Sequence, residues 1–70
     1  MERTPVSSSN IAAVGHNSQS MVLEVEFNNG ALYEYYEVSE QVYFDLINAG
    51  SVGGFFNSSV KNSYSCTRIQ

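Results

Sequence analysis

MVLEVEFNNGALYEYY, residues Met21 to Tyr36, is the stretch of the chain that predicts the fold. Apolar and polar side chains alternate from Leu23 to Phe27, with the period of a strand that has one buried face. Asn28-Asn29-Gly30 supplies turn residues, and a second alternating run follows from Leu32 to Tyr36. This stretch therefore predicts two antiparallel strands joined by a tight turn.

The register of this hairpin follows from the need to keep one face apolar. A two-residue loop would place Val25 opposite Glu34, so a charge would enter the apolar face. A three-residue loop places Val25 opposite Tyr33 instead, and it usually ends in a residue with positive φ, which suits Gly30. We therefore predict the three-residue loop, with one face formed by Leu23, Val25, Phe27, Ala31, Tyr33 and Tyr35 and the other by Glu24, Glu26, Leu32, Glu34 and Tyr36.

Local patterns on either side of the hairpin predict the remaining elements. Residues 11–15 form a first short strand and residues 15–19 the turn after it. Ser39 suits the N-cap of a helix, which residues 49–50 end and whose apolar face carries Val42, Tyr43, Leu46 and Ile47. Residues 52–60 favour a short second helix, and residues 64–69 favour a closing strand.

These elements predict an α+β fold in the order β-β-β-α-(short α)-β. A small antiparallel sheet is covered on one face by one main helix, and the last strand returns to the sheet. The 70 residues fit one domain, which we place at residues 7–70, after a mobile tail at residues 1–6. So small a core makes self-association an expectation, with apolar area offered by Leu32, Tyr36, Phe55 and Phe56.

Composition excludes several classes of protein. A single cysteine, Cys66, rules out an internal disulfide framework, and with one histidine it argues against a structural metal centre. No cofactor motif is present, because Gly53-Gly54 lacks the lysine and the spacing of a phosphate loop. No apolar run is long enough to cross a membrane, and no secretory signal is visible. With one free thiol, the expected compartment is the cytoplasm.

The balance of charge disfavours binding to duplex DNA. Seven acidic and three basic residues give a net charge of −4, and the basic residues are only Arg3, Lys61 and Arg68. Proteins that grip a phosphate backbone usually carry a basic patch or stripe. An acidic surface suits a protein partner with a basic patch, or it keeps the molecule in solution.

The candidate ligand-binding residues are Lys61, Tyr64, Arg68 and Tyr36. In a terminal strand Tyr64, Cys66 and Arg68 share a face, and with Lys61 nearby they could hold a phosphate or carboxylate. The alternative for Arg68 is a surface ion pair with a hairpin glutamate. Tyr36 lies on the opposite hairpin face, as a candidate for an exposed contact.

Two aromatic residues have competing interpretations. Tyr33 and Tyr35 could stack an unpaired base, but we favour a core role beneath the helix face of Val42 and Leu46. The chain also contains a histidine and a cysteine, yet nothing places His16 and Cys66 together as a base and nucleophile. We interpret them as a turn histidine and a packed strand cysteine, and we expect no catalytic site.

Several short motifs follow one another in a distinctive order. These are Ser8-Ser9-Asn10-Ile11, Val14-Gly15, Tyr33-Glu34-Tyr35, Phe56-Asn57 and the closing Lys61, Tyr64 and Arg68. Their order and spacing, over about residues 7–69, resemble the KTSC domain family, which has a central Tyr-x-Tyr. That family is a short bacterial and phage domain that occurs alone and at the C-terminus of some lysyl-tRNA synthetases. The resemblance implies a role in RNA binding.

Two functional classes remain open at this point. The first is a non-enzymatic binding module for single-stranded RNA or a nucleotide-like anion, held by exposed aromatic residues with Lys61 and Arg68. The second is a protein-interaction module, such as a small phage accessory or anti-defence protein that blocks a host factor. The acidic charge favours a protein partner or a small ligand over a long nucleic acid, whereas the family resemblance favours RNA.

Overall fold

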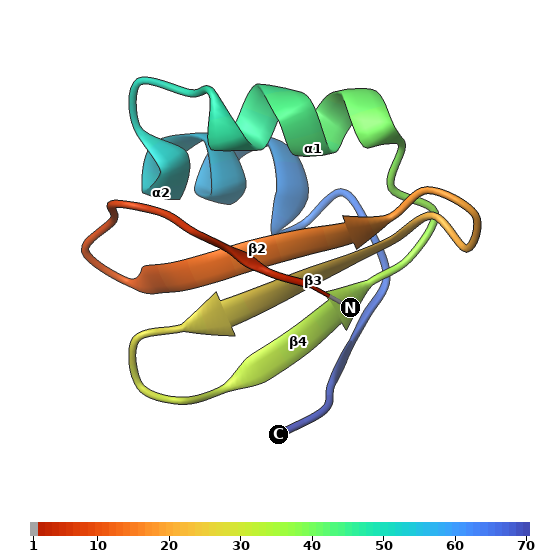
Figure 1. Ribbon diagram of the computed structural model, residues 1–70, viewed down its shortest axis with the longest axis horizontal. Coiled ribbons are helices and arrows are strands. Elements are labelled where there is room, and N and C mark those ends of the chain that lie inside the picture. The colour runs from red at the N-terminus through yellow and green to blue at the C-terminus, as the bar shows by residue number, and fades with distance from the viewer. Residues whose placement is uncertain (1) are drawn as a thin grey trace.

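Five strands of residues 2–70, the part of the chain that the computed structural model describes, form one antiparallel sheet in the order β1-β2-β3-β4-β5. Two helical segments connect β4 to β5 and lie on one face of the sheet (Figure 1). We call this covered face the inner face and the opposite one the outer face. The elements are β1 (Thr4–Pro5), β2 (Ile11–Asn17), β3 (Val22–Phe27), β4 (Leu32–Tyr35), α1 (Glu40–Ile47), α2 (Val52–Phe55), the π-helical turn η1 (Phe56–Val60) and β5 (Cys66–Arg68).

The predicted hairpin register is confirmed. Val25 pairs with Tyr33 across β3 and β4, and Leu23 pairs with Tyr35. The three-residue loop is closed by hydrogen bonds in both directions, because the Phe27 N–H donates to the Ala31 carbonyl at 2.9 Å and the Gly30 N–H donates to the Phe27 carbonyl at 3.0 Å. Gly30 has φ of 91°, as a loop of this length requires. The apolar side chains of the hairpin therefore lie on the inner face.

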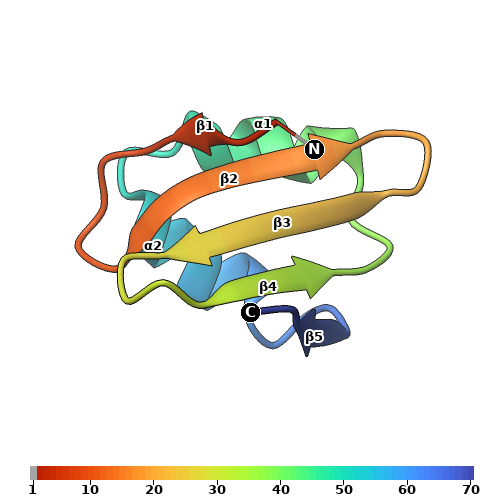
Figure 2. The same cartoon turned by 60° about the horizontal axis from the view of Figure 1, so that its bottom comes forward.

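Both edges of the sheet are short strands (Figure 2). The closing strand is confirmed as β5, which pairs with β4 so that Arg68 lies beside Tyr33 and Cys66 beside Tyr35. The other edge, β1, was not predicted: Thr4 and Pro5 pair with β2 inside the segment that we expected to be a mobile tail. The signal was missed because a two-residue strand has no periodicity of its own.

A close approach of two backbones makes the β1 edge possible. A Cβ atom placed on Gly15 of β2 would lie 2.5 Å from the carbonyl oxygen of Glu2. Only glycine leaves that space open to the backbone of the neighbouring β1 segment. β2 also runs two residues beyond its predicted end, so His16 lies in a strand and not in a turn. Its Nε2 lies 2.6 Å from the Val38 carbonyl, and its ring stacks on Tyr43.

Both predicted helices are present on the inner face. Ser39 caps α1 by accepting a hydrogen bond from the Val42 N–H at 3.3 Å, and Ser51 caps α2 in the same way through Gly54. The core role of Tyr35 is confirmed, since it is 4 % exposed. The aromatic ring that packs against Tyr35, however, comes from Phe56 in η1 and not from the face of α1.

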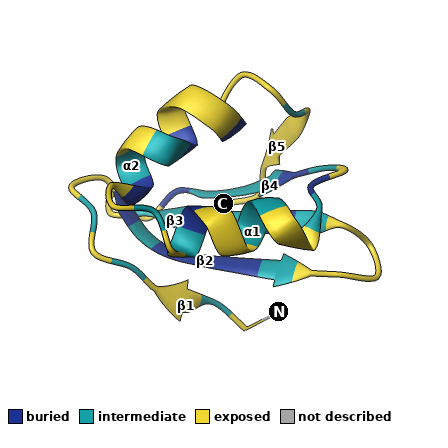
Figure 3. Cartoon of the chain, turned by 90° about the horizontal axis from the view of Figure 1, so that it is seen from above, coloured by how far each residue is buried: buried dark blue, intermediate teal, exposed yellow. Residues whose placement is uncertain are grey.

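The core forms where these helical segments meet β2, β3 and β4, as the buried residues in Figure 3 show. Phe56 is 2 % exposed, so the prediction that it offers a surface for self-association is wrong. Val52, Phe56 and Val60 follow one another at intervals of four residues, so they share the face of this helical segment that packs on the sheet. Among residues 2–70, the large apolar residues that remain exposed are Met21, Phe44 and Ile69. No helix among residues 2–70 combines the length and apolar character that a membrane span requires.

Candidate functional site

An open cleft of about 650 Å³ lies on the inner face between the end of the hairpin, η1 and β5. This is within the usual range for small-ligand sites, about 300–1,000 Å³. The helices do not lie over the edge of the sheet where β4 pairs with β5 (Figure 3). β5 is the edge strand there, and all of its residues are exposed. The cleft therefore combines a packed floor with one open wall.

Four aromatic rings form the floor of the cleft. Phe27 contacts Tyr33 edge-to-face at a centroid distance of 5.6 Å, and Tyr33 stacks on Tyr35 at 6.3 Å. Phe56 completes the cluster of four rings, with edge-to-face contacts to Tyr35 at 5.5 Å and to Phe27 at 5.6 Å. Each contact lies within the range of favourable aromatic pairs. The floor is therefore rigid, and the half-buried Tyr33 lies on its open side.

The floor carries two hydroxyls, those of Tyr33 and Tyr35, and the second lies on the more buried residue. Tyr35 is 4 % exposed, yet its hydroxyl hydrogen-bonds to no other residue among residues 2–70. Since the described chain has no buried polar side-chain atom without a partner, this oxygen must reach the open space of the cleft. Burial raises the pKa of Tyr35 to about 12, with smaller contributions from Cys66 and Tyr33. Tyr35 is thus a neutral hydrogen-bond donor that faces the cleft.

The cationic groups of the cleft are Lys61 and Arg68. Lys61 follows the end of η1, and Arg68 extends from β5 beside Tyr33. Arg68 donates from Nε to the Gln70 carbonyl at 3.2 Å, and neither cation has a carboxylate within ion-pair distance in the described chain. No aspartate or glutamate lines the cleft among residues 2–70. The cleft is therefore positive although the chain is acidic.

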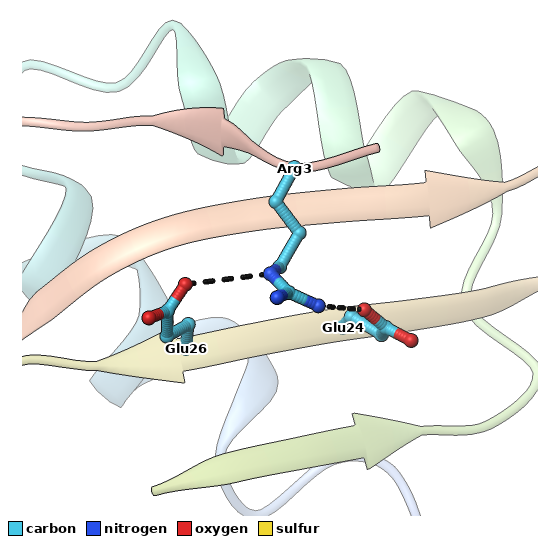
Figure 4. A network of polar contacts seen from close by, with 3 residues as sticks. All are labelled: Arg3, Glu24 and Glu26. Carbon is cyan, nitrogen blue, oxygen red and sulfur yellow. Dashed lines mark hydrogen bonds and ion pairs between the residues drawn. The ribbon is translucent and has the colours of Figure 1, made fainter. Parts of the chain in front are cut away.

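The third cation, Arg3, lies on the outer face of the sheet (Figure 4). Its Nη1 lies 2.6 Å from the Glu24 carboxylate and its Nε 3.4 Å from the Glu26 carboxylate. The hydrogen bond with Glu24 raises the pKa of Arg3 above its ordinary value. The ion pair that we considered for Arg68 with the hairpin glutamates is thus made by Arg3, because Arg68 points to the other face.

The structure brings together two of the four predicted ligand residues. Lys61 and Arg68 line the cleft, whereas Tyr64 precedes β5 and packs against the core. Tyr36 lies on the outer face, as predicted, but its hydroxyl donates to Glu34 at 3.3 Å. Cys66 shares the face of Arg68, yet it is exposed at the cleft and not packed as predicted.

Sequence analysis missed the asparagines around the cleft. Asn28 and Asn29 come from the hairpin loop, Asn57 from η1 and Asn62 from the segment after it. Asn28 holds the wall in place, since its Nδ2 donates to the Ser9 carbonyl at 3.1 Å. The side chains of Asn57 and Asn62 hydrogen-bond to no residue that the structure describes, so they can serve a ligand. Only the Phe56-Asn57 motif could have signalled one of them.

The structure keeps the histidine and the cysteine of the chain apart. His16 lies on β2 and Cys66 on β5, with β3 and β4 between them in the sheet, so they cannot act as a base and nucleophile pair. No histidine or carboxylate lines the cleft beside Cys66 in residues 2–70. Within the same range, no three His, Cys, Asp or Glu side chains gather as metal ligands would.

Comparisons with known proteins identify relatives of this chain. The chain is 46 % identical over 57 residues to a protein of Tsukamurella paurometabola, covering 81 % of this chain and 85 % of the relative. It is 36 % identical over 54 residues to a lysine–tRNA ligase of Nostoc punctiforme, covering 77 % of this chain but only 10 % of the ligase.

A solved structure provides the comparison of folds. The crystal structure of a KTSC domain protein from Yersinia pestis superposes with a TM-score of 0.92 at 34 % identity, covering 99 % of this chain and 97 % of that one. The family model of the KTSC domain matches residues 7–64, which include the aromatic floor of the cleft and Lys61. On this combined evidence of sequence and fold, the chain belongs to the KTSC domain family.

Proposed function

We propose that this KTSC domain is a non-enzymatic binding module for a nucleotide-like anion, held in the cleft between the hairpin, η1 and β5. One observation carries the proposal: a chain of net charge −4 gathers two of its three basic side chains, Lys61 and Arg68, at a cleft without acidic lining. Charge-assisted hydrogen bonds from such cations suit a phosphate. The aromatic floor offers the open side of Tyr33 to a base.

RNA is the source of the ligand that we favour. The relative from Nostoc punctiforme is a lysine–tRNA ligase, a protein whose name assigns it a tRNA substrate. Bases that stack on aromatic side chains must first be free of a duplex, so the ligand is single-stranded. A long strand is disfavoured, because the protein outside the cleft carries its acidic groups and would repel further phosphates. The proposed ligand is therefore a nucleotide or a short single-stranded RNA.

Calorimetric titration with uridine monophosphate and a short oligouridylate tests this proposal. Arg68→Gln should weaken binding by about tenfold or more, the loss expected for one charged hydrogen bond. Its matched control is Arg3→Gln, which removes the same charge from the outer face and should leave the affinity unchanged. Equal losses in both variants would indicate only a general effect of net charge. Failure of the native protein to bind either probe would reject the proposal.

The second candidate function is protein interaction, as in a small phage accessory or anti-defence protein. The outer face favours it, because no helix covers this face and it carries Glu24, Glu26 and Glu34 together with Ile69, which is 50 % exposed. Such a face suits a basic partner. Glu34→Lys and Ile69→Ser should then abolish capture of a partner while leaving nucleotide binding intact. A partner retained by both variants would argue against this face.

A further inference from the structure

A second hollow of about 500 Å³ continues the cleft toward the start of α2. The two hollows share Ser9, Asn10 and Asn57 on their walls. They are therefore neighbouring parts of one groove, which begins at β5 and ends where the segment before β2 faces α2. We call the second part the serine end of the groove, after Ser7, Ser8, Ser9 and Ser51, which line it.

The chemistry of the serine end differs from that of the cationic cleft. Its walls among the described residues are hydroxyls, side-chain amides, the backbone of Gly50, Gly53 and Gly54 and one apolar residue, Val52, with no charged side chain and no aromatic ring. A charged group placed there would lose water without gaining an ionic partner, which is unfavourable. An uncharged group with several hydroxyls would find both donors and acceptors.

The serine end is held in shape by its own hydrogen bonds. Ser8 Oγ donates to Asn10 Oδ1 at 3.1 Å and accepts from the Ile11 N–H at 3.4 Å. Asn28, in the hairpin loop, holds the same segment from the other side through the Ser8 and Ser9 carbonyls. These contacts fix the wall before any ligand arrives, which lowers the entropic cost of binding.

Other polar groups at the serine end are not used by the fold. The side chains of Ser7, Ser9 and Asn57 hydrogen-bond to no residue in the described chain, and Asn10 keeps its amide N–H groups free. Asn57 and Ser9 lie at the junction with the cationic cleft. Side-chain donors and acceptors without a protein partner thus line the groove from the cationic cleft, where we propose that the phosphate binds, into the serine end.

We infer that the serine end is a second subsite, which takes a sugar-like polyhydroxyl group joined to the phosphate held by Lys61 and Arg68. This inference rests on the proposed function and specifies its ligand more closely, as a nucleotide whose phosphate carries a further sugar. Two sources supply that chemistry, the next ribose of an RNA chain and the hexose of a nucleotide sugar. Both present neutral hydroxyls on a sugar that is joined directly to a phosphate.

Titration with uridine ligands separates these sources. Uridine monophosphate and UDP fill the cationic cleft alone, the dinucleotide UpU adds a second uridine with its ribose, and UDP-glucose adds a hexose to UDP. The native protein should bind UpU about tenfold more tightly than the monophosphate, or UDP-glucose about tenfold more tightly than UDP, as one or two further hydrogen bonds would give. The longer ligand that shows the gain identifies the source, and a gain for both indicates a subsite that recognises the shared hydroxyl chemistry.

Ser7→Phe tests the place of the second subsite. Ser7 is exposed and lines only the serine end, so a bulky ring there should fill the subsite without disturbing the core. The variant should lose the gain for the longer ligand and bind the monophosphate as before. Its matched control is Ser18→Phe, in the β2–β3 turn at the other end of the sheet from α2 (Figure 2).

The outcomes separate this inference from the proposed function. If the monophosphate binds but neither longer ligand binds more tightly, the second subsite is refuted and the cationic cleft stands. The subsite is equally refuted if Ser7→Phe keeps the gain for the longer ligand with an unchanged melting temperature. If no uridine ligand binds the native protein, the proposed function itself fails and this inference fails with it.

Discussion

The two faces of the sheet each carry an arginine, and the two arginines have opposite surroundings. On the outer face, Arg3 crosses Gly15 and pairs with Glu24 and Glu26. On the inner face, Arg68 lies beside Tyr33 at an open cleft and finds no carboxylate among residues 2–70. A cation that the protein neutralises helps to hold an edge strand, whereas a cation left beside a cleft is available to an external anion.

The largest expected effect is the difference in stability between losing a buried ring on the inner face and losing an exposed one. Phe56→Ala removes a ring that is 2 % exposed and contacts both Phe27 and Tyr35, so it should cost about 3–5 kcal/mol of unfolding free energy. Its control, Phe44→Ala, removes a ring that is 45 % exposed and should change stability by less than about 0.5 kcal/mol. Urea denaturation compares them, and similar losses would contradict the buried position of Phe56.

The next effect tests how the outer face holds β1. Gly15→Ala would bring a Cβ atom to 2.5 Å from the Glu2 carbonyl, so the edge strand must shift, at a cost of about 1–3 kcal/mol. Gly50→Ala is the control, because its Cβ would meet no heavy atom within 4 Å. Thermal denaturation should show a lower melting temperature for Gly15→Ala only. Hydrogen exchange at residues 3–6 should accelerate in that variant, and unchanged exchange would count against the strand.

A pH titration addresses the hydroxyl of Tyr35 on the inner face. The pKa of Tyr35, about 12, lies above the ordinary value of about 10. The contribution of neutral Tyr35 to the free energy of unfolding is therefore fully present below pH 10. It is lost as pH rises toward 12, by up to about 1.4 kcal/mol for each pH unit. Tyr35→Phe should remove this part of the alkaline loss, and it should cost little stability at pH 7 because the hydroxyl has no protein partner. Identical alkaline curves for both proteins would contradict the assignment.

The smallest effect concerns the two arginines directly. Arg3→Gln should lower the melting temperature slightly at low salt and less at high salt, because exposed ion pairs are weak and screened. Arg68→Gln should leave the melting temperature nearly unchanged at any salt concentration, since its guanidinium pairs with no aspartate or glutamate in the described chain and its one hydrogen bond, to the Gln70 carbonyl, is exposed. A loss of stability in Arg68→Gln would show that this residue serves the fold and not a ligand.

The hairpin and the helix start could be predicted from the sequence because both depend on neighbouring residues. Alternation from Leu23 to Phe27 places side chains on faces, and a one-residue slip would reverse them all. Ser39 caps α1 through a residue only three positions away. Once β5 was predicted, the same alternation placed Arg68 and Cys66 on one face. These features involve contacts whose geometry the backbone period already determines.

Only the tertiary structure decided which distant segments meet. Local pattern assigned Thr4 and Pro5 to a tail, because their strand exists only where Gly15 lets another backbone approach. It left Phe56 exposed, whereas η1 turns this ring onto Tyr35. The family order of motifs grouped Lys61, Tyr64 and Arg68, but the cleft takes two of them and adds asparagines from the hairpin loop and η1. Sequence period fixes the face on which a side chain lies, while its neighbours on that face depend on how the segments pack.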